Sequence, residues 1–302
     1  MKKENQPETK YILLVGDGMG DYPLSELDGK TPLEVARTPN MDRIAACRIG
    51  LANTIPEGLE PGSDTANLSL MGYDPATYHT GRGPFEAASM GIRLGEKEVA
   101  FRMNLVTLDR KSEGEIIMVS NSAGGITTAE SEVLVEDLKK RMAVPGVRLY
   151  PGVAYRHLLV WDGGAETAKT IPPHDVQDQN VATYLNSKGE DGIVEITRRS
   201  WPILESHPVN LSREKKGLLP ANSIWLWGQG KALKLPLFKE IFGLSGGVIS
   251  AVDLLKGIGV YAGLRTINVE GATGYLDTNY AGKATEALNA LNELDFTILL
   301  SR

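Results

Sequence analysis

The stretch YILLVGDGMGD, residues 11–21, decides the fold. Its first five residues are all apolar, and an apolar run without alternating polar residues is typical of a strand buried in the middle of a parallel sheet. The glycine-rich turn that follows places Asp17 at the carboxyl edge of that sheet, where α/β proteins bind their ligands. An aspartate in a turn often caps the next element instead, so Asp17 alone does not separate a binding role from a structural one.

Further along the chain, apolar runs followed by helical patterns recur. The runs lie at residues 224–227, 247–258, 264–269 and 296–300, and helices are expected at residues 38–44 and 283–294. This alternation of strands and helices predicts an α/β fold with helices on both faces of the sheet.

The middle of the chain differs from the rest, because loops interrupt it often. Strands are expected at residues 115–119 and 157–160, and a helix is expected at residues 129–142. Loops are expected at residues 162–164, 172–173 and 186–192. We therefore predict that residues 1–109 and 218–302 form one domain and that residues 110–217 form a smaller α+β domain inserted into it. A single continuous domain is the alternative.

Composition narrows the class of protein. The chain has 302 residues, 42% of them hydrophobic and 23% charged, which is enough for two domains with their own cores. A net charge of −6 argues against a nucleic-acid surface, and no apolar run approaches the roughly 20 residues of a membrane span. The first ten residues are too polar for a secretory signal, and a single cysteine, Cys47, fits a reducing compartment. We expect a cytoplasmic protein without nucleic-acid or membrane partners; its oligomeric state is open.

Ser63 lies at the start of another expected helix. The sequence PGSD at residues 61–64 opens a helical pattern that ends at GYDP, residues 72–75. Amide N–H groups and the helix dipole at such a start favour an anion such as phosphate. A serine hydroxyl becomes an effective nucleophile when its pKa is lowered, which a divalent metal can do without a base. The alternative is that Ser63 is only the N-cap of the helix.

Several basic residues suggest anion binding without being specific for it. Arg82 lies between glycines in TGRGP, residues 80–84, where its planar guanidinium is accessible to phosphate or carboxylate. Arg156, His157 and His174 stand beside turns or strand starts, and each has a structural alternative. The four histidines lack the spacing of a histidine metal cluster.

Taken together, these segments resemble one family, the cofactor-independent phosphoglycerate mutases of the archaeal type, within the alkaline phosphatase superfamily. The resemblance covers residues 11 to 296, and it is specific because many short motifs occur in order. The motifs are GDGMGD at 16–21, GSD at 62–64, GYDP at 72–75, TGRGP at 80–84, FRMNL at 101–105, YPG at 150–152, PPHD at 172–175, HPVN at 207–210, IWLWGQG at 224–230, SAVDL at 250–254 and the segment 271–283.

The resemblance implies an isomerase of glycolysis and gluconeogenesis that interconverts 3-phosphoglycerate and 2-phosphoglycerate without 2,3-bisphosphoglycerate. Ser63 would accept the phosphoryl group and return it to the other hydroxyl of glycerate. Two divalent ions, Mn²⁺ or Mg²⁺, would lie in an alkaline-phosphatase-like domain with Asp17 and Ser63 among their ligands. The inserted domain would be a lid that excludes water from the small-molecule substrate. By their positions in matching motifs, the substrate-side residues are Arg82, Asn104, Arg156, His157 and His174.

Two departures from the family pattern matter. The pattern leads us to expect a histidine where this chain has Gly125, and its loss would weaken the acid–base handling of the glycerate hydroxyl. In the family an acidic, histidine-bearing segment with further metal ligands follows the strand at 296–300, whereas this sequence stops at Arg302. We therefore expect incomplete metal sites, an uncovered sheet edge and a risk of exposure for Phe296, Ile298 and Leu300.

Two other functions fit the same residues. One is a metal-dependent phosphatase, or a mutase on another phosphorylated small molecule, which would share Asp17 and Ser63 but differ in its lid. The other is a catalytically inactive fragment that holds phosphate at the Ser63 helix without binding two metal ions.

Overall fold

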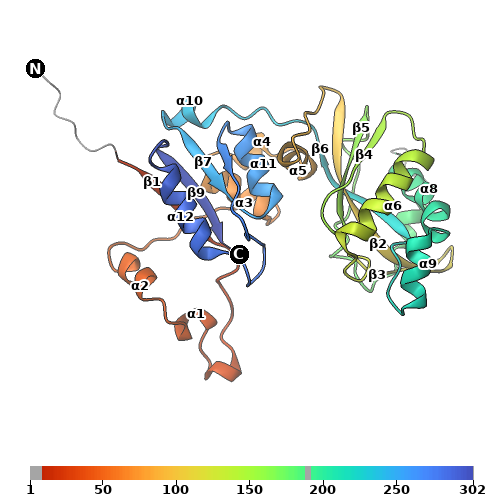
Figure 1. Ribbon diagram of the computed structural model, residues 1–302, viewed down its shortest axis with the longest axis horizontal. Coiled ribbons are helices and arrows are strands. Elements are labelled where there is room, and N and C mark those ends of the chain that lie inside the picture. The colour runs from red at the N-terminus through yellow and green to blue at the C-terminus, as the bar shows by residue number, and fades with distance from the viewer. Residues whose placement is uncertain (1–8, 188–191, 302) are drawn as a thin grey trace, which may run out of the picture. The chain divides into compact units, whose positions relative to one another are not determined.

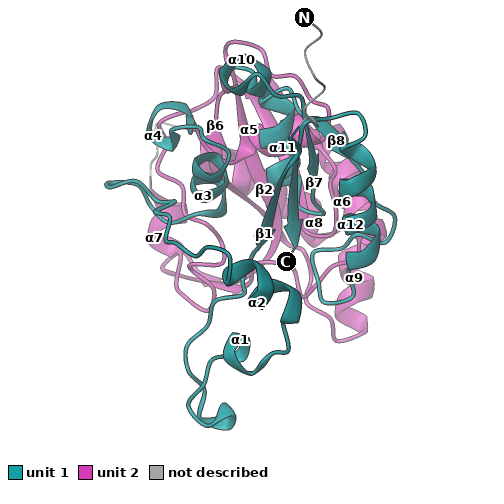
Figure 2. Cartoon of the chain, turned by 90° about the vertical axis from the view of Figure 1, so that its left-hand side faces the viewer, with its two compact units in different colours: residues 1–79, 235–302 teal, residues 80–234 magenta. Residues whose placement is uncertain are grey.

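The chain divides into two compact units, and the computed structural model describes residues 9–187 and 192–301 of them. Unit 1 contains residues 1–79 and 235–302, and unit 2 contains residues 80–234 (Figure 2). Unit 2 is wider at both ends than the predicted insertion, residues 110–217. The reason is β2 (Glu98–Ser112), which pairs with three strands of unit 2 and so forms the centre of its sheet.

Unit 1 is built on a four-stranded parallel sheet with the order β1-β9-β7-β8 (Figure 1). Its strands are β1 (Tyr11–Gly16), β7 (Gly246–Ile249), β8 (Arg265–Ile267) and β9 (Phe296–Ser301). Its helices are η1 (Ser25–Leu27), α1 (Pro32–Val35), α2 (Pro39–Ala45), α3 (Ser63–Leu70), α4 (Pro75–Tyr78), α10 (Phe238–Phe242), α11 (Asp253–Tyr261) and α12 (Tyr280–Ala290). Because β1 pairs directly with β9, the unit needs the chain on both sides of unit 2.

Helices cover both faces of the β7–β9 part of this sheet. On one face, α11 approaches so closely that a Cβ on Gly259 would lie 2.6 Å from Val248 of β7. On the other face, Ile249 and Leu299 pack with Ala287 of α12. The expectation of a mixed α/β fold is therefore confirmed for this unit.

The position of β1 differs from the prediction. It is an edge strand of the described sheet, and Tyr11, Ile12 and Leu14 are 48%, 49% and 61% exposed, so the expected central, buried strand is wrong. The central strand is β9, where Phe296, Ile298 and Leu300 are all buried, so the expected risk of exposure for these residues is also wrong. The cause is the strand order, in which β9 has a neighbour on each side.

Unit 2 is built on an antiparallel sheet in which β2 pairs with β3, β5 and β6, and β5 pairs with β4. The other strands are β3 (Glu115–Ser120), β4 (Val147–Tyr150), β5 (Arg156–Asp162) and β6 (Ser223–Gly230). The helices are α5 (Gly83–Ser89), α6 (Thr128–Arg141), α7 (Ala182–Asn186), α8 (Ile193–Glu205) and α9 (Pro208–Lys215). Within the described residues of the whole chain, no helix combines the length and apolar character that a membrane span requires.

The two faces of the unit 2 sheet have different environments. One face carries Phe101 and Met103 of β2 into the main core beneath α6 and α8, the helices drawn along one side of the sheet in Figure 1. The other face carries Trp225 and Trp227 of β6 into a second core that α7 contributes to. Since side chains alternate along a strand, Arg102 lies on the Trp227 face and not in the main core.

Candidate active site

Ser63 is the first residue of α3, and its side chain is exposed. The N-cap is Gly62 rather than Ser63, so the capping explanation for this serine does not hold. The hydroxyl therefore stands at the positive end of a helix dipole, where a developing negative charge is favoured.

Neighbouring side chains hold the backbone of the Ser63 turn. The Asn67 amide donates to the carbonyl oxygen of Ser63 at 2.7 Å, one helical turn later. Asp64 Oδ2 lies 2.9 Å from His79 Nε2. The turn that presents the hydroxyl is therefore anchored on two sides, which reduces the conformational freedom that a nucleophile would have to lose on reaction.

Asp17 follows β1 directly, and its N–H donates to Ser301 O of the adjacent strand at 2.8 Å. Both residues line a cavity of about 530 Å³ at the carboxyl ends of β1 and β9, together with Met41, Tyr280 and Lys283. The structure thus confirms the expected position of Asp17 at the carboxyl edge of a parallel sheet, the usual ligand edge of such sheets.

Lys283 is a functional candidate that our reading of the sequence missed. Its side chain is only 2% exposed, its Nζ lies 3.5 Å from Leu300 O, and burial lowers its pKa. A buried lysine that lines the same cavity as an aspartate is a candidate for a functional role. The signal in the sequence was a lysine in the buried stripe of α12, where Ala287 and Ala290 follow at helical spacing.

Within the described residues, no three Asp, Glu, His or Cys side chains come together as a metal centre would require. Asp17 offers a carboxylate, but the charged neighbour in its cavity is the cation of Lys283. The residues described do not by themselves fit a complete site for a divalent ion.

In unit 2, Trp227 is surrounded by polar groups. The guanidinium of Arg102 lies 4.2 Å from the Trp227 ring centre and that of Arg82 lies 5.7 Å from it. Asn104 Oδ1 accepts a hydrogen bond from Trp227 Nε1 at 3.1 Å, and the His174 ring lies 5.4 Å away, edge to face. The structure therefore brings together three of the five substrate-side candidates, and it adds Arg102.

The charge around Trp227 is positive. Glu86 of α5 pairs with Arg102 at 2.8 Å and with Arg82 at 3.7 Å. Burial lowers the pKa of Arg102 to about 10, Glu86 acts in the opposite direction, and the charges of Arg82 and Arg156 lower it further. Arg82 and Arg102 thus share one glutamate, and the charge of Arg156 also acts on Arg102, an arrangement to which the carboxylate or phosphate of a ligand would add negative charge.

His157 is not part of this group. It pairs with Met103, so its side chain lies on the face of the main core, whereas Arg156 precedes it on the Trp227 face. Its Nδ1 accepts from the N–H of Gly152 at 3.0 Å, and burial lowers its pKa to about 4, which keeps the ring neutral. Its Nε2 is buried and has no hydrogen-bond partner among the described residues, and its role as a substrate-side residue stays a prediction.

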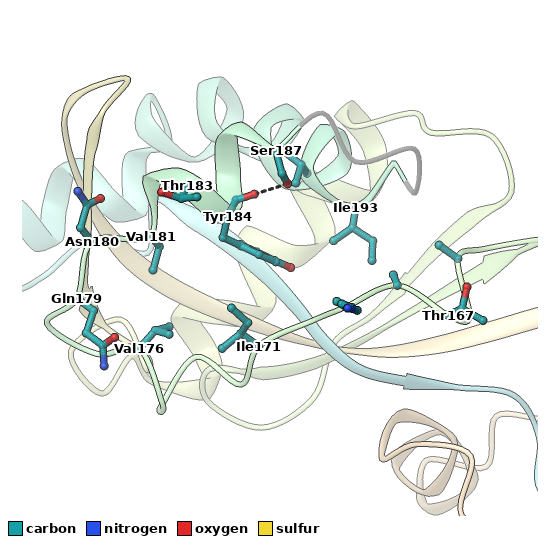
Figure 3. Close-up of a pocket in the computed structure, with 14 residues that line it drawn as sticks. Thr167, Ile171, Val176, Gln179, Asn180, Val181, Thr183, Tyr184, Ser187 and Ile193 are labelled. Atoms are coloured by element: carbon teal, nitrogen blue, oxygen red, sulfur yellow. Dashed lines mark hydrogen bonds between the residues drawn. The ribbon is translucent and has the colours of Figure 1, made fainter.

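A larger cavity of about 910 Å³ lies elsewhere in unit 2, between α7, the start of α8 and the segment before α7 (Figure 3). Figure 3 shows Ile171, Tyr184 and Ile193 on its wall, with Ser187 Oγ donating to Tyr184 O at 2.7 Å. None of the substrate-side candidates lines it. Its size alone therefore does not make it the substrate site.

Comparisons of the sequence with a family model and with curated proteins identify the same family. The family model of 2,3-bisphosphoglycerate-independent phosphoglycerate mutase matches residues 45–210. A protein of Methanothrix thermoacetophila named as this mutase is 55% identical over 293 residues, which are 96% of this chain and 72% of that protein. A probable mutase of the same kind from Geobacter sulfurreducens is 53% identical over 292 residues, which are 96% of this chain and 73% of that protein.

Two solved structures are also similar. A protein of Pyrococcus horikoshii matches with a TM-score of 0.76 and 32% identity, over 97% of this chain and 70% of that one. A cofactor-independent phosphoglycerate mutase of Thermoplasma acidophilum matches with a TM-score of 0.54 and 29% identity, over 97% of this chain and 77% of that one.

Proposed function

The chain belongs to the 2,3-bisphosphoglycerate-independent phosphoglycerate mutases, and we propose that it interconverts 3-phosphoglycerate and 2-phosphoglycerate with Ser63 as the phosphoryl acceptor. Enzymes of this family are isomerases and do not use 2,3-bisphosphoglycerate. The observation that carries the assignment to Ser63 is an exposed hydroxyl at the start of α3, in a turn anchored by Asn67 and Asp64.

The proposed reaction has two transfers of the same kind. Ser63 Oγ forms a bond to phosphorus while the bond from phosphorus to the glycerate oxygen breaks, and the serine proton passes to that oxygen. After glycerate has turned, its other hydroxyl takes the phosphoryl group, and a proton returns to Ser63. The N-terminus of α3 stabilises the charge on the phosphoryl oxygens during both transfers.

The cationic cluster of unit 2, which we define as Arg82 and Arg102 beside Trp227 together with Arg156, whose charge acts on Arg102, is proposed to hold the anionic groups of the substrate. A guanidinium can hold a carboxylate or phosphate oxygen pair in a fixed orientation. Unit 2 would then act as the lid of an alkaline-phosphatase-like unit 1 and keep water from phospho-Ser63. Asn104 and His174, which both contact Trp227, are proposed to bind the hydroxyls of glycerate.

Two divalent ions, Mn²⁺ or Mg²⁺, are part of the proposal because the family resemblance implies them. When bound, such ions would lower the pKa of the serine hydroxyl and neutralise phosphoryl charge. Asp17 and Ser63 are the groups proposed to face them. Lys283 lines the same cavity as Asp17 and adds a positive charge to it.

A second candidate function is phosphatase activity, which the loop around Gly125 favours. Ala123, Gly124 and Gly125 all have positive φ, of 48°, 62° and 71°, and Gly125 is exposed with open space around the position of a Cβ. There is space for a side chain at this position, although the positive φ disfavours one, and the chain has none. If that side chain normally handles a glycerate hydroxyl, water would compete better for phospho-Ser63.

An enolase-coupled assay with added Mn²⁺ tests the proposal. We expect isomerisation in the wild type, a loss of roughly 10³-fold or more in Ser63→Ala, and a phosphorylated Ser63 peptide after a rapid quench. Ser69→Ala in the same helix is the matched control, because the buried Ser69 hydroxyl has no hydrogen-bond partner among the described residues. Equal activity in wild type and Ser63→Ala would overturn the assignment, and release of free phosphate faster than isomerisation would favour the phosphatase.

A further inference from the structure

The turn that presents Ser63 is held by a residue from outside α3. His79 Nε2 lies 2.9 Å from Asp64 Oδ2, and the two side chains are 27% and 14% exposed. Because an ionised carboxylate only accepts hydrogen bonds, the imidazole Nε2–H is the donor. A hydrogen bond to a charged acceptor in a mostly buried position is stronger than one between neutral groups.

The second oxygen of the same carboxylate contacts Gly62. A Cβ at position 62 would lie only 2.4 Å from Asp64 Oδ1. The backbone of Gly62, with φ −163° and ψ 151°, is extended and would suit any residue, so a side chain at position 62 would act by displacing the Asp64 carboxylate. The two oxygens of the Asp64 carboxylate therefore face Gly62, the residue before Ser63, and His79, the residue that follows α4.

His79 is also the last residue of unit 1 before the chain enters unit 2. The next residue is fixed within unit 2, because Thr80 Oγ1 donates to Lys231 O at 2.7 Å. Gly81 packs so closely against β6 that a Cβ there would lie 1.9 Å from Gln229 O. A single peptide bond thus separates the residue that holds the Ser63 turn from residues anchored in the other unit.

We infer that His79 is a positioning residue for Ser63 that acts through Asp64 and couples the nucleophile turn to the point where the chain crosses into unit 2. His79 does not touch the reacting atoms. Its hydrogen bond fixes Asp64, and Asp64 fixes the turn on either side of Ser63. The inference rests on the proposed role of Ser63 as nucleophile.

Three variants test this inference by kinetics. His79→Leu removes the donor, Gly62→Ala displaces the carboxylate without removing a polar group, and His79→Gln keeps a donor. Because a small displacement of a nucleophile is costly, we expect kcat to fall about tenfold or more in the first two, with KM for 3-phosphoglycerate changed less than about twofold. His79→Gln should recover kcat to within about threefold of wild type, since it keeps a donor to the charged carboxylate.

Thr77→Val is the matched control, because it removes the 2.6 Å hydrogen bond from Thr77 to Asp74 in the neighbouring helix and leaves the Ser63 turn intact. It should have wild-type kcat. Wild-type kcat in both His79→Leu and Gly62→Ala would overturn the inference. If His79→Leu fails to fold, Gly62→Ala and His79→Gln still decide it.

Amide hydrogen exchange gives a readout that does not depend on catalysis. His79→Leu and Gly62→Ala should speed exchange in the first turn of α3, whereas His79→Gln and Thr77→Val should not. Equal activity of wild type and Ser63→Ala would show that the proposed function is wrong, while the exchange data would still test the anchoring by His79. Unchanged exchange in both His79→Leu and Gly62→Ala would overturn the anchoring itself.

Discussion

Arg102 is a cation that the fold keeps almost completely out of water. Removing a charge from water costs several kcal/mol, and the pair with Glu86 together with the Trp227 ring offsets part of that cost. With Arg82 and Arg156 nearby, the group keeps an excess of positive charge. This excess of positive charge at a buried position supports the proposal that the group binds an anion.

The substitution Arg102→Lys tests this site, because it keeps the charge but removes the planar guanidinium that stacks on Trp227. We expect KM for 3-phosphoglycerate to rise about tenfold or more, which corresponds to roughly 1.4 kcal/mol, with a smaller change in kcat. Steady-state kinetics of the isomerisation measure both constants.

The chain offers a close control for this substitution. Arg110 lies 4.5 Å from the ring centre of Trp201 and is paired with Glu205, so it repeats the chemistry of Arg102 elsewhere in unit 2. Arg110→Lys should leave KM unchanged. If both variants change KM equally, the effect belongs to the stability of unit 2 and not to substrate binding.

At the scale of single residues, the sequence predicted which residues are candidates for the site better than it predicted which side chains lie next to one another. Arg82, Asn104 and His174 come together as expected of a shared site, although their roles stay predictions. Strand alternation sends His157 to the opposite face from Arg156, and a motif match cannot show that. Lys283 was missed because a lysine in an apolar helical stripe reads as a surface residue until its burial is known.

At the scale of the elements, the Asp295 side chain connects the starts of three strands of the unit 1 sheet, β1, β7 and β9. Its carboxylate accepts from the N–H and the hydroxyl of Ser245, just before β7, at 3.0 and 2.7 Å, and from Lys10, just before β1, at 3.2 Å. Asp295 itself precedes β9. These hydrogen bonds, those to Ser245 first, lower the pKa of Asp295 to about 2.

This predicts an acid-dependent contribution of Asp295 to stability. Because its pKa is lower in the folded than in the unfolded chain, the stabilisation is present above about pH 4 and is lost as the pH falls through about 2. Asp295→Asn should therefore have a lower melting temperature than wild type at pH 7. The difference between the two melting temperatures should become smaller as the pH falls toward 2. Calorimetry across this pH range measures it.

Asp28→Asn is a suitable control for the pH series, because it removes a carboxylate from the turn after η1, where asparagine tolerates the left-handed backbone equally well. Its melting temperature should follow that of wild type at every pH. A wild-type pH profile in Asp295→Asn would contradict the proposed tie between the strands.

The elements themselves were easier to predict than their order. The run at residues 11–15 is a strand, and the helix at 283–294 largely matches α12. A strand whose residues are all apolar reads as central, yet β1 lies at the edge, because pairing order depends on contacts with β9 at the other end of the sequence. Local periodicity carries no information about such distant partners.

At the scale of the whole molecule, unit 2 is one uninterrupted segment with its own core, and its two ends lie together where Thr80 bonds to Lys231. We predict that residues 80–234 fold alone. All four tryptophans, Trp161, Trp201, Trp225 and Trp227, lie in this unit, so tryptophan fluorescence reports on it selectively. The fragment should show a cooperative urea transition with a midpoint close to that seen by fluorescence in the full chain.

A fragment of residues 110–217 is the control, because it lacks most of β2 and all of β6, which form the centre of the sheet. It should lack a cooperative transition. An unfolded 80–234 fragment would show that unit 2 depends on unit 1. The sequence predicted an insertion at residues 110–217 but not the bounds of unit 2. The prediction rested on frequent loops, and these begin only after β2, although β2 is itself part of the unit 2 sheet.

The direct pairing of β1 with β9 also has a consequence for biosynthesis. At about 5–20 residues per second, the ribosome delivers β9 roughly 15 to 60 s after β1. Unit 2 is fully synthesised within that interval, while β1 still waits with its apolar side chains and backbone groups unpaired. The nascent chain therefore carries β1 without its partner until β9 has been made, so slower elongation lengthens the time during which this strand is exposed.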